Sequence, residues 1–220
     1  MAAVRSCLLR TARIPSMPKL SARTRARKIK LLLFDVDGVL TDGKLFFLPD
    51  RQGGADLQSG KGKSQLTAQG SIEFKAFHAH DGIAVSLARV GGLETGLITM
   101  RFSDTVALRA RDLKLAFVRQ GAHDKGAALE EIAREAGLEC DEVSFVGDDI
   151  VDLTAMRAAG LAIAVKNARD EVKCEAHYVT PHAGGDGALR DAVEFILKAQ
   201  GKWKRVVEDY IRGKSGSHGN

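Results

Sequence analysis

Apolar residues along this chain gather in short continuous runs, separated by longer segments in which they recur every three or four positions. Short continuous runs are typical of strands buried on both faces, as in a parallel sheet. The runs that fit are KLLLFDVDG (30–38), ETGLIT (94–99), LAFVR (115–119), EVSFVG (142–147) and LAIAV (161–165). We therefore expect these segments to form the strands of one parallel sheet.

The segments between the runs have the spacing of helices that bury one face. Helices are expected from Asp81, after the capping residues Ser103 and Asp124, and from Asp149. A last helix places five apolar residues on one face: Leu189, Ala192, Val193, Ile196 and Leu197. Strands alternating with helices of about 10–15 residues indicate an α/β fold with a doubly wound, Rossmann-like parallel sheet and right-handed crossovers.

Two further segments alternate apolar and polar positions. KLFFL (44–48) and SIEFKAF (71–77) predict the strands of a β-hairpin inserted after the first strand, over residues 44–77. The connection between them, residues 49–70, is rich in glycine and has no periodicity. It is longer than most hairpin loops.

The net charge of +5 comes from the start of the chain. Residues 1–30 hold nine Lys and Arg and no acidic residue, which leaves 24 basic against 28 acidic residues in the rest. A mildly acidic body gives no support to nucleic-acid binding. No apolar run is long enough to cross a bilayer, so we expect no membrane association.

The 220 residues suffice for one domain with a core, which we place at 29–203. Residues 1–28 are interpreted as a basic, disordered extension, with a transit peptide or a basic arm as alternatives. Residues 204–220 are polar and are expected to form a frayed tail. Three scattered cysteines form no disulfide framework, which favours a reducing, cytoplasmic location.

Chemically active residues follow four of the predicted strands. Asp35 and Asp37 follow the first, Thr99 ends the second, Lys125 comes after the third and Asp148 after the fourth. Because ligands bind beyond the carboxyl ends of strands in such sheets, these side chains are expected to meet in one crevice. A single Asp-X-Asp is weak as a signal, but four strand ends in this order are hard to explain by packing.

This set of residues suits phosphoryl transfer through an aspartyl phosphate. One carboxylate attacks phosphorus, and a second, two residues on, protonates the leaving alcohol and then activates water. Mg²⁺ prefers oxygen ligands, and Asp35, the backbone carbonyl of Asp37 and Asp148 would supply them. Lys125 and the Thr99 hydroxyl would stabilise the phosphoryl group.

The same motifs resemble those of the haloacid dehalogenase superfamily over residues 29–203. DVDGV (35–39) is similar to its nucleophile motif, Thr99 to its second, Lys125 to its third and GDDIVD (147–152) to its fourth. The resemblance implies that Asp35 is the nucleophile and Asp37 the general acid/base. Asp149 and Asp152 are expected behind the metal ligands, with Asp149 reaching the metal through water or holding Lys125.

Neither place where this superfamily inserts a cap is long enough for a full cap domain. About sixty residues separate Asp37 from Thr99, of which the hairpin and its loop use half, and twenty-two separate Lys125 from Asp148. A capless enzyme leaves its site open to water, and a neighbouring subunit would cover it.

At this point the chain resembles the capless 3-deoxy-D-manno-octulosonate 8-phosphate phosphatase family. The stretches that carry the resemblance include DVDGVLTDGKLFF, FHAHDGIAV, QGAHDKGAALEEI, FVGDDIVDLTAM and YVTPHAGGDGALRDAVEFILKAQG. The resemblance implies a Mg²⁺-dependent phosphatase of lipopolysaccharide biosynthesis and a homotetramer. In it the hairpins, which carry Phe46, Phe47, Phe74 and Phe77, form a central barrel, and the C-terminal tail covers a neighbour's site.

The resemblance also implies contacts to an anionic sugar phosphate. Residues 78–82 would line the sugar pocket, with His78, His80, Asp81 and Gly82 as candidate contacts beside Asp37 and Lys125. Arg101 and Arg109 are candidate clamps for the carboxylate or phosphate.

The chain departs from the family pattern at Met100, His80 and Ser86 and in the length of loop 49–70. These positions concern substrate recognition. An acylneuraminate 9-phosphate or another small phosphate ester is therefore an alternative substrate, and a non-catalytic assembly module is an alternative function.

Overall fold

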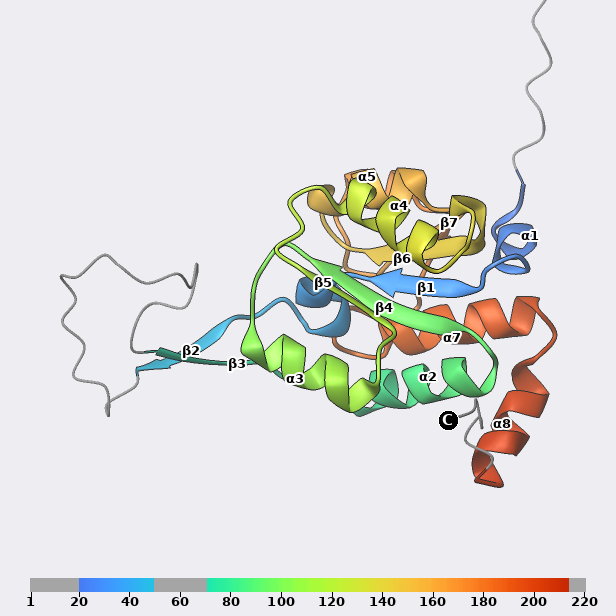
Figure 1. The fold of residues 1–220 in the computed structure, drawn as a ribbon, viewed down its shortest axis with the longest axis horizontal. Helices are drawn as coiled ribbons and strands as arrows, with labels where there is room; N and C mark the ends of the chain where they lie inside the picture. The colour runs from blue at the N-terminus through green and yellow to red at the C-terminus, as the bar shows by residue number, and fades with distance from the viewer. Residues whose placement is uncertain (1–19, 50–70, 214–220) are drawn as a thin grey trace, which may run out of the picture.

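The computed structural model describes residues 20–49 and 71–213. A six-stranded parallel sheet forms the centre, with strand order β5-β4-β1-β6-β7-β8 (Figure 1). The strands are β1 Leu31–Phe34, β4 Glu94–Thr99, β5 Phe117–Gln120, β6 Val143–Gly147, β7 Leu161–Ala164 and β8 Tyr178–Val179. The predicted doubly wound α/β fold is confirmed, and the short strand β8 at one edge is an addition to the prediction.

Strand β1 lies in the middle because all four of its residues are apolar and fully buried. It pairs with β4 on one side and β6 on the other, so that Phe34 lies beside both Leu97 and Val146. A parallel strand with apolar side chains on both faces requires a cover on each face.

Helices supply that cover in two layers. Figure 1 shows α2 (Ala79–Val90), α3 (Asp104–Leu113) and α7 (Ala188–Ala199) below the sheet, and α4 (Lys125–Glu135) and α5 (Leu153–Ala158) above it. The short helix α6 (Asp170–Glu175) follows β7. Two predicted caps are present: Ser103 accepts a hydrogen bond from the Val106 N–H, and Asp124 accepts from Gly126 and Ala127.

The connections reverse direction between β1 and β6. The chain runs from β1 outward to β4 and β5, then returns to β6 and continues outward to β7 and β8. A reversal of this kind leaves a crevice at the carboxyl ends of the two central strands. The loops after β1 and β6 therefore meet there.

The predicted domain limits are wrong at both ends. Residues Ala22–Ala26 form a short helix, α1, capped by Ser21, and Ala26 is fully buried against the core. Residues Trp203–Ile211 form helix α8, with Val206 fully buried, instead of a frayed tail. Residues 1–19 and 214–220 lie outside the described part of the chain.

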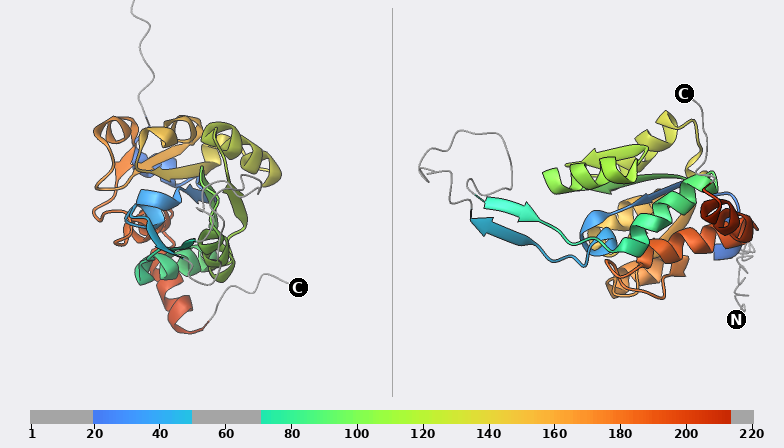
Figure 2. Two further views of the ribbon diagram at one scale, coloured as in Figure 1. Left: turned by 90° about the vertical axis from the view of Figure 1, so that its left-hand side faces the viewer. Right: turned by 90° about the horizontal axis from the view of Figure 1, so that it is seen from below.

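The hairpin is present but shorter than predicted. It pairs β2 (Phe46–Pro49) with β3 (Ser71–Phe74), and Phe46 lies opposite Phe74 with ring centroids 4.9 Å apart. It projects from the carboxyl-end edge of the body (Figures 1 and 2). Its loop, residues 50–70, lies outside the described residues. Among the helices described, none has the length and apolar character needed to span a membrane.

Candidate active site

The turn that follows β1 places Asp35 and Asp37 at the crevice. Residues Val36–Leu40 form one tight turn, η1, closed by a hydrogen bond from the Thr41 N–H to the Val36 carbonyl oxygen. Gly38 has a φ of 97°, which disfavours any residue with a Cβ. A Cβ at Gly38 would also lie 2.1 Å from Asp148 Oδ2, so glycine here allows the two loops to approach.

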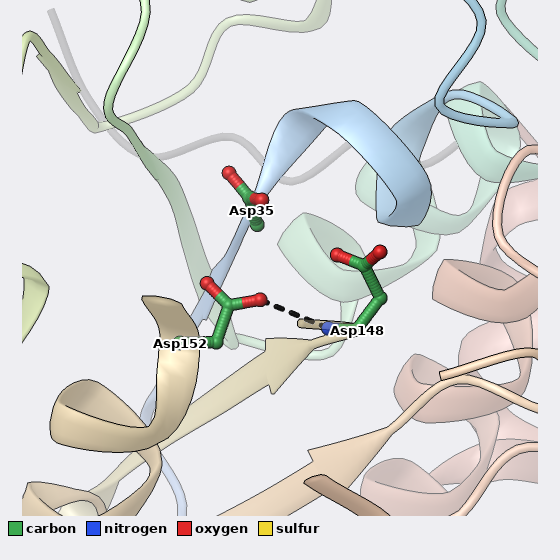
Figure 3. A group of neighbouring side chains, drawn as sticks. All are labelled: Asp35, Asp148 and Asp152. Atoms are coloured by element: carbon green, nitrogen blue, oxygen red, sulfur yellow. Dashed lines mark hydrogen bonds between the residues drawn. The ribbon is translucent and has the colours of Figure 1, made fainter. Parts of the chain in front are cut away.

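The loop after β6 supplies the opposing carboxylates. Asp148 follows the strand directly, and Asp152 ends the short 3₁₀ turn η3 (Ile150–Asp152). Figure 3 shows Asp35, Asp148 and Asp152 converging, with the Asp152 carboxylate turned toward the Asp148 backbone nitrogen. Asp152 is fully buried, and its Oδ2 accepts from the Asp148 N–H at 2.9 Å and the Asp149 N–H at 3.3 Å.

Lys125 lies beneath these carboxylates. Its side chain is 1% exposed, and Nζ is 2.6 Å from Asp152 Oδ1 and 2.9 Å from Asp35 Oδ1. Burial alone would lower the pKa of Lys125, but the two carboxylates outweigh it and raise the pKa. The ammonium group is therefore a fixed positive charge next to Asp35. The contact to Lys125 considered for Asp149 belongs to Asp152, while exposed Asp149 accepts from the Ile150 N–H.

The crevice carries excess negative charge. Burial, followed by repulsion from Asp152, raises the pKa of Asp35 to about 7 despite the attraction of Lys125. Burial and repulsion from Asp152, Asp35 and Asp149 raise the pKa of Asp148 to about 7 as well. Carboxylates in this state are stabilised when a cation lies between them.

The free oxygens identify which aspartates can hold that cation. Carboxylate oxygens of Asp35, Asp148 and Asp152 lie within 4.8 Å of one another. Both oxygens of Asp152 are already occupied by Lys125 and backbone N–H groups. Asp148 Oδ1 is buried and accepts no hydrogen bond, and Asp35 Oδ1 is paired with Lys125 alone. Two neighbouring carboxylates with this remaining acceptor capacity fit a hard divalent cation that keeps its other positions for water or substrate. A carbonyl ligand from Asp37 stays a prediction.

Asp37 lies in a second charged group that sequence reasoning missed. Lys75 Nζ is 2.5 Å from Asp37 Oδ1, and Arg101 Nε is 3.5 Å from Asp37 Oδ2. Glu73 contacts both cations, at 3.4 Å from Lys75 and 3.0 Å from Arg101. Lys75 and Glu73 share one face of an alternating strand pattern, and that spacing was the available signal.

The end of β4 contributes Thr99 and Arg101 to the same crevice. Thr99 is 3% exposed, and its Oγ1 accepts a hydrogen bond from the Arg101 N–H at 3.4 Å. The hydroxyl proton of Thr99 can still be donated to a ligand. Arg101 Nε is buried and makes no hydrogen bond, and it lies 3.5 Å from Asp37 Oδ2.

The predicted sugar-pocket segment, residues 78–82, lies at the start of a helix. Helix α2 begins at Ala79, two residues before the predicted start at Asp81, with His78 as its N-cap. The His78 Nδ1 accepts from the His80 N–H, and the two rings lie 4.8 Å apart. His78 Nε2 lies 3.9 Å from Asp186 Oδ1, while His80 is exposed.

Asp81 supports the fold at the start of α7. It is fully buried, and its carboxylate accepts from the backbone N–H groups of Gly187 and Arg190. These bonds give Asp81 a role as a helix cap, and a substrate contact at Asp81 stays a prediction.

Arg109 is already paired within its own helix. Its Nη1 lies 2.5 Å from Asp112 Oδ2, and its guanidinium lies over the Phe77 ring. A Cβ at Gly82 would lie 2.8 Å from Arg109 Nη2, so Gly82 makes room for this arginine. The roles of Arg109 and Gly82 toward a substrate stay predictions.

A glycine-containing loop before α7 packs on the nucleophile turn. The Gly185 N–H donates to the Val39 carbonyl oxygen at 3.0 Å. A Cβ at Gly184 would lie 1.7 Å from the Gly38 carbonyl oxygen, so the backbone of this loop is in direct contact with the backbone of turn η1. This loop fixes the turn that carries Asp35 and Asp37.

The family profile of haloacid dehalogenase-like hydrolases matches residues 102–190. The chain is also 32% identical over 179 residues to the 3-deoxy-D-manno-octulosonate 8-phosphate phosphatase of Salmonella typhi, which covers 81% of this chain and 85% of that protein. The chain belongs to this phosphatase family. A second member of the 3-deoxy-D-manno-octulosonate 8-phosphate phosphatase family, from Yersinia pestis, is 33% identical over 81% of this chain and 84% of its own length.

Solved structures of the family have the same fold. The phosphatase from Moraxella catarrhalis, solved in complex with magnesium, phosphate and the sugar acid, matches with a TM-score of 0.73 and 32% identity. The match covers 86% of this chain and 97% of that one. The Yersinia pestis phosphatase matches with a TM-score of 0.71 and 32% identity, over 83% and 88% of the two chains.

Proposed function

We propose that this protein hydrolyses 3-deoxy-D-manno-octulosonate 8-phosphate to the free sugar acid and inorganic phosphate, with Mg²⁺ as cofactor. One observation carries the proposal: Asp35, Lys125 and Asp148 converge at the crevice between β1 and β6 in a chain of this phosphatase family. A protein that only assembled with partners would not require three clustered carboxylates, one with a buried oxygen that accepts no hydrogen bond, around a buried lysine.

Asp35 acts as the nucleophile in this proposal. One of its oxygens forms a bond to phosphorus while the bond from phosphorus to the sugar oxygen breaks, and Asp37 gives that oxygen a proton. Water then attacks the phosphorylated Asp35 and gives its proton to Asp37, which releases phosphate and restores both carboxyl groups. Lys125 and the Thr99 hydroxyl stabilise negative charge on the phosphoryl oxygens.

Asp35 and Asp148 would hold the magnesium ion through carboxylate oxygens. When bound, the ion supplies positive charge that offsets the repulsion between the carboxylates and the phosphate. Asp152 keeps Lys125 and the Asp148 backbone in place, since both of its oxygens are bonded to them.

The sugar acid carries its own carboxylate, and Arg101 is our candidate to bind it. The partly exposed side chain of Arg101, 26% exposed, and its position beside Asp37 support this role. His78, His80 and Arg109 are further candidates, proposed from the family resemblance. The substrate-recognition departures at His80 and Met100 make the sugar the part of the proposal that most needs testing.

We also propose that copies of the chain assemble through the hairpin as a homotetramer in the cytoplasm. Support comes from apolar side chains on both strands, which are 38–57% exposed in the single chain: Phe46, Phe47, Leu48, Ile72 and Phe74. A two-stranded hairpin is marginal on its own, so packing against other copies would stabilise it.

The test is phosphate release by the purified full chain from the octulosonate 8-phosphate, an acylneuraminate 9-phosphate and a hexose phosphate. We expect preference for the first ester, loss of turnover when a chelator removes Mg²⁺, and loss in Asp35→Asn. Preference for the acylneuraminate ester would reassign the substrate. Full turnover by Asp35→Asn would refute the mechanism, and no release from any ester would refute the enzyme.

A further inference from the structure

The general acid/base proposed above does not stand alone in the crevice. Asp37 is 19% exposed at its side chain and is held on its inner side by Lys75, whose own side chain has no exposure. A buried ammonium group needs a partner, because an unpaired charge inside a protein is costly. Lys75 has two partners, Asp37 at 2.5 Å and Glu73 at 3.4 Å.

Glu73 anchors this lysine to the body of the protein. Its carboxylate accepts hydrogen bonds from the Ser103 hydroxyl and from Arg101, and its backbone carbonyl accepts from Thr105. Burial works to raise the pKa of Glu73, but the Ser103 hydrogen bond, Lys75 and Arg101 outweigh it and lower the pKa. Glu73 is thus a fixed anion that orients both cations.

We propose that Lys75 is a positioning residue for Asp37, with Glu73 as its anchor. The inference rests on the proposed function, since it assigns Asp37 the transfer of a proton to the leaving sugar oxygen. The bond from Lys75 Nζ to Asp37 Oδ1 fixes the rotation of the carboxyl group. The other oxygen, Oδ2, has only the longer contact of 3.5 Å to Arg101 Nε and is therefore the one we assign to proton transfer. Both residues come from the hairpin: Glu73 lies in strand β3, and Lys75 follows the end of that strand.

A direct substrate contact by Lys75 fits the geometry less well. The side chain of Lys75 is fully buried, whereas the Arg101 side chain beside Asp37 is 26% exposed. The two cations therefore have different roles. Lys75 orients the Asp37 carboxyl group from the buried side, and Arg101 is accessible to a ligand.

The dependence on the leaving group distinguishes a positioning role from a general structural one. The alkoxide of a sugar leaves only with a proton, whereas p-nitrophenolate leaves without one. The parameter to compare is kcat/KM, because it reports the steps through phosphoryl transfer to Asp35 and excludes the later hydrolysis. Lys75→Met removes the charge and keeps a long apolar chain.

We expect Lys75→Met to lower kcat/KM for the octulosonate phosphate about 100-fold, the range of one general acid, and that for p-nitrophenyl phosphate less than about fivefold. Glu73→Gln should show the same discrimination with smaller losses, and it serves if Lys75→Met does not fold. The matched control is Lys44→Met, an exposed lysine paired with Asp42 at 2.7 Å, which should leave both values unchanged.

Three results would overturn the inference. Equal losses for the two esters would make Lys75 a support for the whole site. A raised KM with unchanged kcat for the sugar ester alone would make Lys75 a substrate contact. Wild-type protein that hydrolyses neither ester would refute the proposed function, and the inference with it.

Discussion

Without a bound metal, repulsion among the carboxylates of the crevice should lower the stability of the folded protein. The substitution Asp148→Asn tests this expectation. Three carboxylates, those of Asp35, Asp148 and Asp152, face the single ammonium group of Lys125. Asparagine has nearly the same shape as aspartate, so the tight contact between this side chain and Gly38 is kept. The substitution therefore removes one negative charge and little else.

The size of the effect follows from the pKa of Asp148. A rise from 3.8 to about 7 means that ionising this group costs the folded protein about 4 kcal/mol relative to the unfolded chain. Asp148 is only partly buried, so water screens part of this cost, and we expect about 2 kcal/mol. For a chain of this size that is a rise in Tm of about 4–8 °C.

The direction of the pKa shift of Asp148 determines whether stability rises or falls with pH. A carboxyl group with a raised folded-state pKa holds its proton more tightly in the folded protein, so stability falls as pH rises from about 4 to about 7 and stays low above that. The advantage of Asp148→Asn should therefore be largest near pH 8 and shrink toward pH 5.

The assay is thermal unfolding with a chelator and with Mg²⁺, at both pH values. With the chelator at pH 8, Asp148→Asn should be more stable than wild type, while Mg²⁺ should stabilise wild type and have little effect on the variant. Asp141→Asn is the control, since Asp141 forms an exposed pair with Lys28 and should change stability by less than about 0.5 kcal/mol. A variant less stable than wild type under chelation would refute the reasoning.

Three further changes test other parts of the structure. Asp152→Asn should lower turnover at least about 100-fold, because Lys125 loses its closest partner; phosphate release measures this, and near-normal turnover would contradict it. Gly184→Ala should lose activity by displacing the Gly38 backbone, whereas Gly92→Ala, with open space around it, should cost only about 1 kcal/mol and keep its rate. Val206→Ala should cost about 2 kcal/mol in urea unfolding, and equal stability of variant and wild type would mean that α8 is not docked.

The sequence was sufficient for the central fold because each strand there carries a short apolar run, and the run is unbroken in the middle strand β1. Strand β4 has the predicted limits, Glu94–Thr99, and helix α3 starts after Ser103 as expected. The strand ends then place Asp35 and Asp148 together, since the topology leaves no other position for them.

The parts that sequence reasoning missed depend on partners far along the chain. Asp81 looked like a pocket residue, but its partners are backbone N–H groups about a hundred residues away, at the start of α7. Lys75 pairs with Asp37 only because the residues that follow β3 return to the loop after β1. Helix α8 is a different case: apolar residues at 203, 206, 207 and 210 have helical spacing, and that signal was available.

The hairpin has a consequence for how the enzyme responds to its own concentration. Its base holds the proton donor through Lys75, while its outer faces expose Phe46, Leu48 and Ile72 to solvent in the isolated subunit. Dilution that separates subunits would loosen the outer strands first and misalign the donor next. If the proposed assembly forms, specific activity on a sugar ester would then decline on dilution while the circular dichroism spectrum stayed constant, and the full rate would require a concentration at which the subunits associate.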